Sequence, residues 1–500
     1  MAEITPFRGT RFNPDKIDDL SKVTAPPYDV ISEKERDMFY EAHPANVIRL
    51  ILGKHKEGDS KTESRYTRAA DYFKKWRDDE TLIRDESPGI YFVAVDFKLN
   101  ESIVTRFGMV ALAKLEPFEK GVILPHEKTF SKTKSERLEL MKACQVNFSP
   151  IFSVYQDKKG FLSSLRDDIM KENPDSDFVD GFGHRHRMWR IADPSIHDGI
   201  RDAMKDVIIY IADGHHRYET ALNYKNWLAS TDKNFNDQHN ANHIMMYLCD
   251  MDDPGMVILP AHRMLKEVDM DRLGEIGRKA RDYFDITTIP FGPDNRKEKA
   301  AEFNALLAAD TSKNRIGVAI KNRSKFYLFT PKTNIMEQTF KDIPPAMLKL
   351  DVTVLTQLIM MELLGFDQQR LDNEKMINYS SVADTALEAV AHEECDVAFI
   401  LNSTKMSQVQ EISREGLIMP RKSTYFYPKV LTGHVMSELR SEEHTSELQS
   451  LVCISYAVHC APAGYLVADS GPLCFGSANS AHVDLFWAYF VAFWVYFELF

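Results

Sequence analysis

The sequence predicts a mixed α/β fold, and two kinds of pattern along its 500 residues support this prediction. Continuous apolar, β-rich runs such as DVIIYIA (206–212) and CDVAFILNST (395–404) are typical of buried strands. Other stretches place apolar residues at helical spacing, as in residues 61–80. Because the two kinds of stretch interleave, strands and helices should share common cores, and the length allows more than one domain.

Residues 1–250 are predicted to form a first domain. Ser32 is a candidate helix cap, with Glu35 as its capping-box partner. Pro26 and Pro27 interrupt an early strand because proline cannot donate to a strand ladder. The elements expected in order are short strands within 4–13 and 23–32, helices at 32–42 and 61–80, paired strands at 89–99 and 106–116, a strand near 122, a helix from about 135, the strand at 206–212 and a helix at 217–230.

Residues 254–437 are predicted to form a second α/β domain. A glycine closes two of its expected helices, Gly365 and Gly416, as is common at helix C-termini. The elements expected in order are a strand followed by a loop within 255–265, a helix at 270–284, a hairpin at 314–330, a helix at 351–365, the strand at 395–404, a helix at 406–416 and a final aromatic stretch at 417–433.

The composition is that of an ordinary globular protein, with 44% apolar and 27% charged residues. A formal net charge of −12 argues against a protein that coats nucleic acid or an anionic membrane, since both need a positive surface. The N-terminal residues lack the apolar core of a signal peptide, and the six cysteines include no CxxC pair. We therefore expect a cytoplasmic protein with reduced cysteines whose partner is a small-molecule substrate.

The last 61 residues look foreign to the rest of the chain. RSEEHTSELQS (440–450) reads like the translation of a short-read sequencing adapter, and the residues after it contain no Lys or Arg. The aromatic run at 485–497 is too short to span a bilayer, which takes about 20 residues in a helix. We interpret residues 440–500 as a non-native tail without function, and the net charge stays negative without it.

The stretch IADGHHRYETALNY (211–224) changes from a strand pattern to a helix pattern within a few residues. An acid, a glycine, two histidines and an arginine stand where the pattern changes. A helix N-terminus attracts anions, a glycine there allows close approach to the backbone, and an arginine offers a bidentate fork for phosphate. The candidate phosphate-binding residues are Asp213, Gly214, His215, His216 and Arg217. Two alternatives stay open: a structural turn in which Asp213 caps the helix, and a metal site that uses His216 and Glu219.

Three further segments carry candidate residues. Asp29 follows two prolines that stiffen the backbone, so its carboxylate could act as a general base or a magnesium ligand, with Tyr28 beside it as a candidate substrate contact; the alternative is an aspartate turn. PHEKTFSKTKSER (125–137) offers His126 and Glu127 as candidate catalytic groups in a polar loop, which could equally be a solvated charged loop.

The third segment, MPRKSTYFYPK (419–429), groups Lys422, Ser423 and Thr424 behind Arg421, a set that could hold a substrate anion. Its alternative is a basic, aromatic strand edge. His262 and Arg263 in ILPAHRML are interpreted as structural. The pattern predicts no protein metal cluster.

These motifs resemble known families. GHHRYETA (214–221) is similar to the Gly-x-His-Arg-Tyr-x-x-Ala signature of sulfiredoxin and to the Gly-Glu-Arg-Arg box of ParB partition proteins, whose shared fold also includes the free serine kinases. Residues 1–437 resemble the family catalogued as domain of unknown function 1015 through PFRGTRF, APPYDVIS, PHEKT, IADGHHRYETAL and MPRKSTYFYPK. The resemblance implies a ParB/sulfiredoxin-like nucleotide-binding core with a second α/β domain, and a turn at 214–217 that binds nucleotide phosphates.

Departures from these families narrow the expected function. His215 stands where sulfiredoxin has its catalytic cysteine, which argues against sulfinic acid reduction, and no helix-turn-helix reader of DNA is evident. The resemblance then implies a phosphotransferase for free serine or phosphoserine that uses ATP or ADP with Mg²⁺, in which Asp29 or Glu127 takes the hydroxyl proton. The alternative is a non-catalytic, ParB-like nucleotide-binding regulator.

Overall fold

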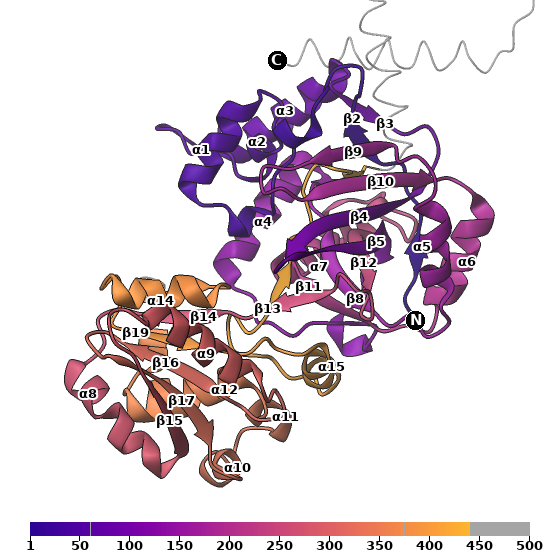
Figure 1. Ribbon diagram of the computed structural model, residues 1–500. Coiled ribbons are helices and arrows are strands. Elements are labelled where there is room, and N and C mark those ends of the chain that lie inside the picture. Colours follow the sequence, from indigo (N-terminus) through magenta and orange to yellow (C-terminus); the bar gives the residue numbers. More distant parts are fainter. Residues whose placement is uncertain (61, 372, 374–375, 441–500) are drawn as a thin grey trace, which may run out of the picture. The chain divides into compact units, whose positions relative to one another are not determined.

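Two β-sheets with helices packed against them organise the structure, a computed structural model that describes residues 1–440 except 61, 372 and 374–375 (Figure 1). Strands and helices alternate along the chain around both sheets, so the predicted mixed α/β class with a second α/β region is confirmed. Apart from Arg440, the predicted non-native tail, with its aromatic run at 485–497, lies outside the described residues.

The first sheet has nine strands and is mixed. Its strands lie in the order β6 (Ile123–Leu124), β11 (Ile209–Asp213), β8 (Ile151–Tyr155), β12 (His243–Asp250), β5 (Ser102–Lys114), β4 (Ile90–Leu99), β10 (Arg185–Ile191) and β9 (Ser176–Val179), and β1 (Ile4–Thr5) pairs with β5. The neighbours β6 and β11, and β8 and β12, are parallel. The predicted pairing of the strands near 89–99 and 106–116 is confirmed, because β4 and β5 form an antiparallel hairpin.

Both faces of this sheet are covered. Successive residues of a strand point to opposite faces, so Phe92 packs in the core on one face and Val93 in the core on the other. The first face packs against α5 (Phe161–Ile169), α6 (Pro194–Met204) and α7 (His215–Thr231). The second face packs against later segments, namely α11 (Pro345–Leu348), α15 (Met406–Arg414) and β20 (Tyr425–Tyr427).

A helical layer formed mostly by the N-terminal residues has its own apolar cluster. It contains α1 (Glu33–Ala42), α2 (Ile48–Ile51), α3 (Arg65–Asp78), α4 (Ser131–Cys144) and the strand pair β2 (Thr10–Phe12) and β3 (Leu82–Arg84). The predicted capping box is confirmed: the Glu35 N–H donates to Ser32 Oγ over 3.3 Å, and the Ser32 N–H donates to the Glu35 carboxylate over 2.8 Å.

The second sheet is antiparallel throughout. Its strands lie in the order β15 (Phe284–Pro290), β17 (Lys325–Pro331), β16 (Ile316–Ile320), β19 (Val397–Ile400), β14 (His262–Leu265) and β18 (Ile377–Ser380). The predicted hairpin at 314–330 is confirmed as β16 and β17.

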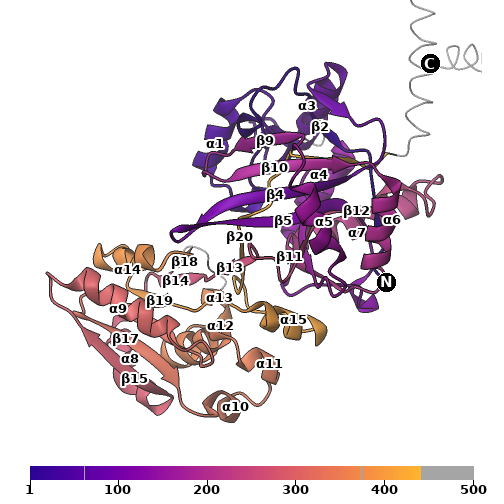
Figure 2. The same ribbon diagram turned by 45° about the vertical axis from the view of Figure 1, so that its right-hand side comes forward.

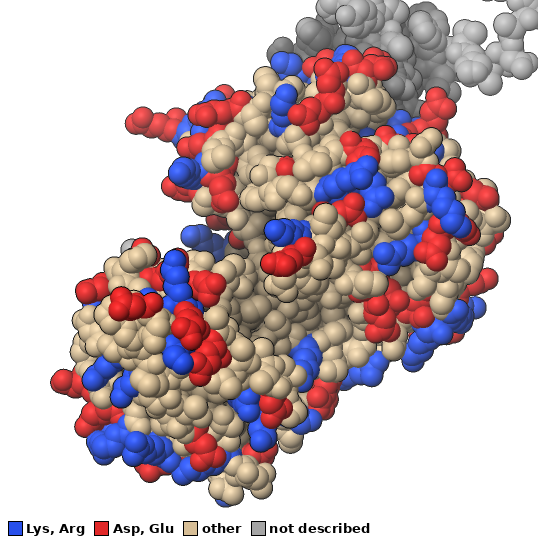
Figure 3. All heavy atoms as spheres, in the orientation of Figure 1, with Lys and Arg blue, Asp and Glu red and all other residues tan. Residues whose placement is uncertain are grey.

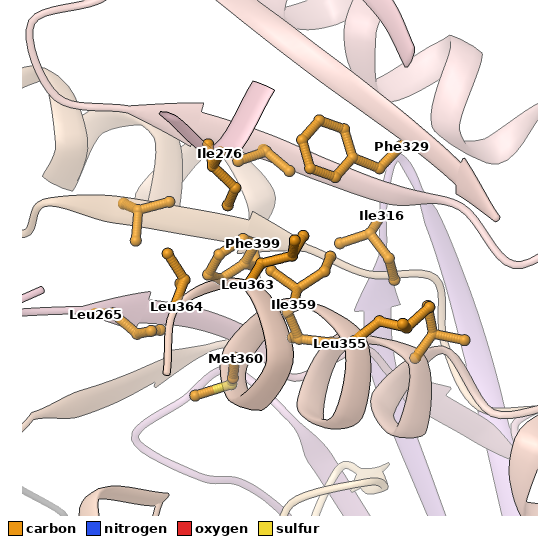
Figure 4. Close-up of a cluster of buried hydrophobic side chains, with 14 of the residues drawn as sticks. Leu265, Ile276, Ile316, Phe329, Leu355, Ile359, Met360, Leu363, Leu364 and Phe399 are labelled. Atoms are coloured by element: carbon orange, nitrogen blue, oxygen red, sulfur yellow. The ribbon is translucent and has the colours of Figure 1, made fainter. Parts of the chain in front are cut away.

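Helices cover both faces of the second sheet as well. On one face lie α9 (Arg296–Ala308) and α14 (Ala383–Ala391), and on the other lie α8 (Met270–Lys279), α12 (Asp351–Val354) and a π-helix (Leu355–Leu363). Figure 4 shows the π-helix directing Leu355, Ile359 and Leu363 toward Ile316 and Phe399 of the sheet. Two short helices, α10 (Ile335–Thr339) and α13 (Gln368–Leu371), lie in the connections.

The last described segment returns to the first sheet and its helical layer. β20 pairs with β13 (Val257–Leu259), and β21 (Ser437–Glu438) pairs with β7 (Val146–Asn147). The Met419 N–H donates to the His126 carbonyl over 2.9 Å. Residues that are far apart in sequence are thereby brought to one place, while the predicted division at 250–254 stays a prediction.

Two local predictions were wrong. Residues 23–32 contain no strand: Tyr28–Val30 is a single 3₁₀ turn, because Pro26 and Pro27 cannot donate hydrogen bonds, and Ala25 makes one isolated bridge to Thr432. Residues 262–265, expected as a loop, form β14 between β18 and β19. The polar residues His262 and Arg263 favoured a loop in the sequence, but the segment is a buried strand with a neighbouring strand on each side.

Charge is spread over the described surface. On the face shown in Figure 3, basic and acidic side chains of the described residues are interspersed, and neither sign forms a continuous patch there. None of the helices within residues 1–440 has both the length and the apolar character that a membrane span requires.

The contacts of the last described residues define where the fold can be cut. Leu439 is 3% exposed, its N–H donates to the Gln145 carbonyl over 2.9 Å, and Arg440 Nε donates to the Gln145 side chain over 2.7 Å. We expect deletion of 441–500 to leave the melting temperature unchanged and to improve solubility, because an uncharged aromatic run of this kind promotes aggregation.

A second truncation, of 437–500, is the matched control for this deletion. It also removes β21 and Leu439 and should cost about 2–5 kcal/mol, the range for losing a buried leucine side chain. Thermal unfolding of both proteins checks the prediction. A clear loss of stability in the shorter deletion would show that the tail belongs to the fold.

Candidate functional site

The turn between β11 and α7 has the conformation that its sequence predicts. Asp213 ends β11, and Gly214 follows as the N-cap of α7 with a φ of +98°, a value that favours glycine. A Cβ atom at this position would lie 2.9 Å from Arg217 Nη2. The backbone angle therefore favours glycine here, and any larger residue would also displace the Arg217 guanidinium.

Asp213 lies between two cations. Its carboxylate accepts from Lys429 Nζ over 2.6 Å and from Arg217 Nη2 over 2.8 Å, and the three side chains are only 11–13% exposed. Burial alone would raise the pKa of Asp213, but the charges of Lys429 and Arg217 outweigh it and lower this pKa to about 2. Asp213 is thus ionised at neutral pH and joins β11 to the segment after β20.

The N-terminus of α7 has no side-chain cap among the described residues. The alternative in which Asp213 caps the helix is wrong, because no side chain among the described residues forms a cap hydrogen bond there. The first N–H groups of a helix have no partner within the helix and carry partial positive charge. This end of a 17-residue helix is therefore suited to bind an anion.

His126 and His215 form a buried pair at the helix start. The His126 N–H donates to His215 Nε2 over 3.2 Å, and the two rings meet edge to face at 4.7 Å. His126 Nε2 lies 3.0 Å from Thr424 Oγ1. Burial lowers the pKa of His126 to about 4 and that of His215 well below its usual value, so both rings are neutral at pH 7. They supply shape and hydrogen bonds rather than positive charge.

Glu127 places a carboxyl group against this pair. Its oxygens lie 3.8 Å from His215 Nδ1 and 3.5 Å from Thr424 Oγ1, and its side chain keeps 34% exposure. Burial raises the pKa of Glu127 to about 7, and the negative charge of Asp213 adds to the effect. Glu127 therefore changes between a proton donor and a proton acceptor close to neutral pH.

His216 and Glu219 hold the loop that carries Glu127. The Phe130 N–H donates to His216 Nε2 over 2.9 Å, and the Phe130 ring stacks on the imidazole. Glu219 accepts from Thr129 Oγ1 over 2.7 Å and from Lys134 Nζ over 2.6 Å. Among the described residues neither side chain belongs to a group that could hold a metal, so the metal alternative at this turn is not supported.

Asp29 and Tyr28 reach the same region from the 3₁₀ turn. Asp29 is exposed, and its charge helps to raise the pKa of Lys429 against the effect of burial. Burial lowers the pKa of His216, and the charge of Asp29 offsets part of that lowering. Tyr28 is half-buried with the Arg137 guanidinium 4.1 Å from its ring centre. Burial raises the pKa of Tyr28 to about 12, so its hydroxyl stays protonated.

The three residues of segment 422–424 have different roles. Lys422 is exposed, and its positive charge offsets part of the rise that burial causes in the pKa of Glu127. Ser423 is buried, its hydroxyl donates to the Pro420 carbonyl over 2.5 Å, and its own carbonyl accepts from Thr404 over 2.6 Å. The hydroxyl of Ser423 therefore holds the local turn, while Thr424 faces His126 and Glu127.

The predicted site segments thus come together: 28–29, 126–127, 213–217 and 422–424 all contact or electrostatically influence one another. The family model described as protein of unknown function (DUF1015) matches residues 4–353. The chain belongs to this family.

The solved structures that match this DUF1015 protein share little sequence with it. A free serine kinase in complex with AMP matches with 14% identity and a TM-score of 0.29, covering 67% of this chain and 92% of that one. A conserved hypothetical protein from Pyrococcus furiosus matches with 13% identity and a TM-score of 0.29, covering 64% and 93%. SbnI with a C-terminal truncation, from Staphylococcus aureus, matches with 10% identity and a TM-score of 0.30, covering 69% and 97%. No curated protein sequence matches.

Sequence reasoning missed Lys429 in this DUF1015 chain. Its ammonium group lies 5.1 Å from the Tyr425 ring centre and pairs with Asp213, 216 positions earlier in the sequence. Although burial opposes the charged form, Asp213 and Asp29 raise the pKa of Lys429. Lys429 is the last residue of MPRKSTYFYPK, and no neighbouring residue in that stretch distinguished it from a lysine at a strand edge.

His262 and Arg263 have the contacts expected of structural residues. His262 Nδ1 accepts from the Leu401 N–H over 3.1 Å, and Arg263 donates to Thr356 and to the Arg421 carbonyl. Both side chains are buried in β14.

The low pKa of Asp213 makes a prediction about acid stability. Its folded-state pKa lies below the ordinary value of 3.8, so its contribution is fully present above about pH 4 and is lost as the pH falls toward 2. Asp213→Asn should remove a pH-dependent stabilisation on the order of 2 kcal/mol.

Denaturant unfolding of both proteins at several pH values measures this difference. The gap between wild type and Asp213→Asn should be largest near neutral pH and should narrow below pH 4. Asp206→Asn, at an exposed position, is the control and should show no such dependence. A gap that stays constant down to pH 2 would contradict the ion-pair account.

Proposed function

We propose that this protein is a nucleotide-dependent phosphotransferase for a small hydroxylated metabolite, with ATP or ADP as the nucleotide and free serine or phosphoserine as the substrate. The observation that carries the proposal is the position of Glu127, whose carboxyl oxygen lies 3.8 Å from Nδ1 of His215, the first residue of α7. This helix end has no side-chain cap among the described residues, and burial raises the pKa of Glu127 to about 7. Phosphoryl transfer to a hydroxyl needs a base poised near neutral pH next to a place that holds phosphate.

The nucleotide phosphates would lie at the N-terminus of α7. The glycine at 214 lets an anion approach the backbone, and the open N–H groups of the helix would donate to it. Lys422 adds an exposed positive charge near Glu127. Arg217 already donates to Asp213 and to the Pro150 carbonyl, so its main contribution is to hold the turn in shape.

The donor set is compatible with Mg²⁺. This ion is commonly held by one or two carboxylates together with phosphate oxygens, and Glu127 and Asp29 are the carboxylates that border the site with no strong ion pair of their own among the described contacts. Asp29 would hold the ion where Glu127 acts as the base, and the ion would neutralise the charge of the phosphates. The protein's own side chains would carry out the remaining steps.

The hydroxyl substrate would meet Glu127. In its ionised form Glu127 would take the proton as the hydroxyl oxygen bonds to the phosphorus and the shortened nucleotide leaves; the reverse sequence would return the proton. Asp29 is the second candidate base. His126 is a weaker one, because a pKa of about 4 makes its ring a poor proton acceptor and its Nε2 lies against Thr424. The choice of serine rests on the resemblance of the Gly-His-His-Arg box to the fold of the free serine kinases.

The test is a turnover assay over a panel of nucleotides with serine, phosphoserine and other hydroxylated metabolites. Glu127→Gln should lower turnover by about 10²–10⁴-fold, the usual contribution of a general base, while it leaves nucleotide binding in place. Glu139→Gln, on the exposed side of α4, is the matched control and should behave as wild type.

One result would decide against this proposal, and a second would change only the assignment of the base. Nucleotide binding without turnover of any panel member would favour the alternative, a nucleotide-binding regulator. Turnover that persists in Glu127→Gln at the wild-type rate would remove Glu127 from the catalytic role and leave Asp29 as the candidate base.

The pKa of Glu127 predicts how the rate depends on pH. The base acts only when it is ionised, so kcat/KM should fall about tenfold for each pH unit below about 7 and level off above it. The pH dependence of kcat/KM in wild type and in Glu127→Asp checks this. A profile that stays flat from pH 5 to 8 would contradict the assignment.

A further inference from the structure

A second cluster of titratable side chains lies on the hairpin of β9 and β10 and shares no residue with the proposed catalytic site. It consists of Asp180, His184 and His186, each offering one ligand atom, and these atoms all lie within 4.8 Å of one another. The three side chains are 8%, 12% and 2% exposed. β10 lies between β4 and the edge strand β9 (Figure 2).

The hairpin turn orients the carboxylate. Asp180 Oδ1 accepts from the N–H groups of Phe182 and His184, each over 2.9 Å, and Gly183 turns the chain with a φ of +82°. The other oxygen, Oδ2, faces the two imidazoles, 3.3 Å from His184 Nδ1 and 2.9 Å from His186 Nε2. One carboxylate oxygen therefore builds the turn, and the other hydrogen-bonds to His186 Nε2, a contact that a bound metal ion would replace.

Strand geometry puts the two histidines together. Residues two apart in a strand point to the same face, so His184 and His186 both project toward Asp180. Arg185 between them points the other way and pairs with Asp177, its Nη2 at 2.5 Å from the carboxylate. The spacing His-x-His after an aspartate thus produces a three-ligand set on one face.

A supporting layer surrounds the three residues. The Tyr427 hydroxyl lies 2.8 Å from His184 Nε2, the ring nitrogen that faces away from Asp180. Phe178 stacks on His186 at 5.3 Å, and Phe97 meets His184 edge-on. Metal-binding histidines characteristically have such a hydrogen-bond partner on the second nitrogen, and an apolar surround keeps bulk water away.

We propose that Asp180, His184 and His186 bind a divalent transition-metal ion, with zinc the preferred ion. Two imidazole nitrogens and one carboxylate oxygen are ligands that zinc accepts, and a water molecule would complete a four-coordinate site. On binding, His184 carries its hydrogen on Nε2 and donates it to Tyr427, His186 presents Nε2 as a lone pair, and any proton displaced goes to solvent. The ion would fasten the hairpin to Tyr427 of β20.

The probe is zinc chloride added to the chelator-treated, full-length protein. Calorimetry should detect a saturable site with one equivalent, and zinc should raise the melting temperature. X-ray absorption of the zinc-loaded wild type should show two imidazoles and one carboxylate oxygen at about 2.0–2.2 Å and no sulfur ligand. Because this last measurement needs no variant, it tests the site even if substitutions disturb folding.

Substitutions then assign the ligands. Asp180→Asn and His184→Gln should each weaken zinc binding by at least about tenfold and abolish the rise in melting temperature. His434→Gln is the matched control, since this buried histidine lies edge-on to His186 but its Nε2 bonds to Ser176. The absence of a saturable site, sulfur ligation, or wild-type affinity in both ligand variants would overturn the proposal, in which case the cluster is a hydrogen-bonded clamp only. Nucleotide turnover is not part of these readouts, so the two proposals can fail separately.

Discussion

The ion pairs of Asp213 are the interaction on which the candidate site depends. This carboxylate sits at the end of β11 and binds Arg217 from the first turn of α7 and Lys429 from the segment after β20. The charges are nearly buried, so removing one partner would leave the others uncompensated, which is costly in a protein interior. Through this carboxylate, a turn in the middle of the chain and a segment near its end are held at a fixed distance.

The arrangement sets the protonation of the neighbouring groups. The negative charge of Asp213 adds to burial in raising the pKa of Glu127 to about 7, while burial keeps His126 and His215 neutral. The candidate site therefore combines a carboxyl group that titrates near neutral pH with uncharged hydrogen-bonding rings and a helix N-terminus without a side-chain cap among the described residues. Under the proposed function, this set would move a proton beside a bound phosphate.

Local patterns in the sequence predicted much of this structure. The strand-to-helix change at 209–231, the positive φ of Gly214 and the capping box at Ser32 depend on neighbouring residues, so they could be predicted. The pairing of Lys429 with Asp213 and the neutral state of His126 could not, because both are created by segments hundreds of residues away. The three-ligand cluster at 180–186 was missed for a related reason: its His-x-His spacing becomes informative only once the strand and its turn are known.

The most direct measurement of the central claim is a crystal structure of the protein with ADP. We expect a phosphate oxygen within hydrogen-bond distance of the backbone N–H groups of His215 and His216, and the Asp213–Lys429 ion pair intact beside it. Glu127 should face the terminal phosphate rather than the adenine. ADP bound elsewhere, with the N-terminus of α7 in contact with protein or water alone, would contradict the assignment of this turn as the nucleotide site.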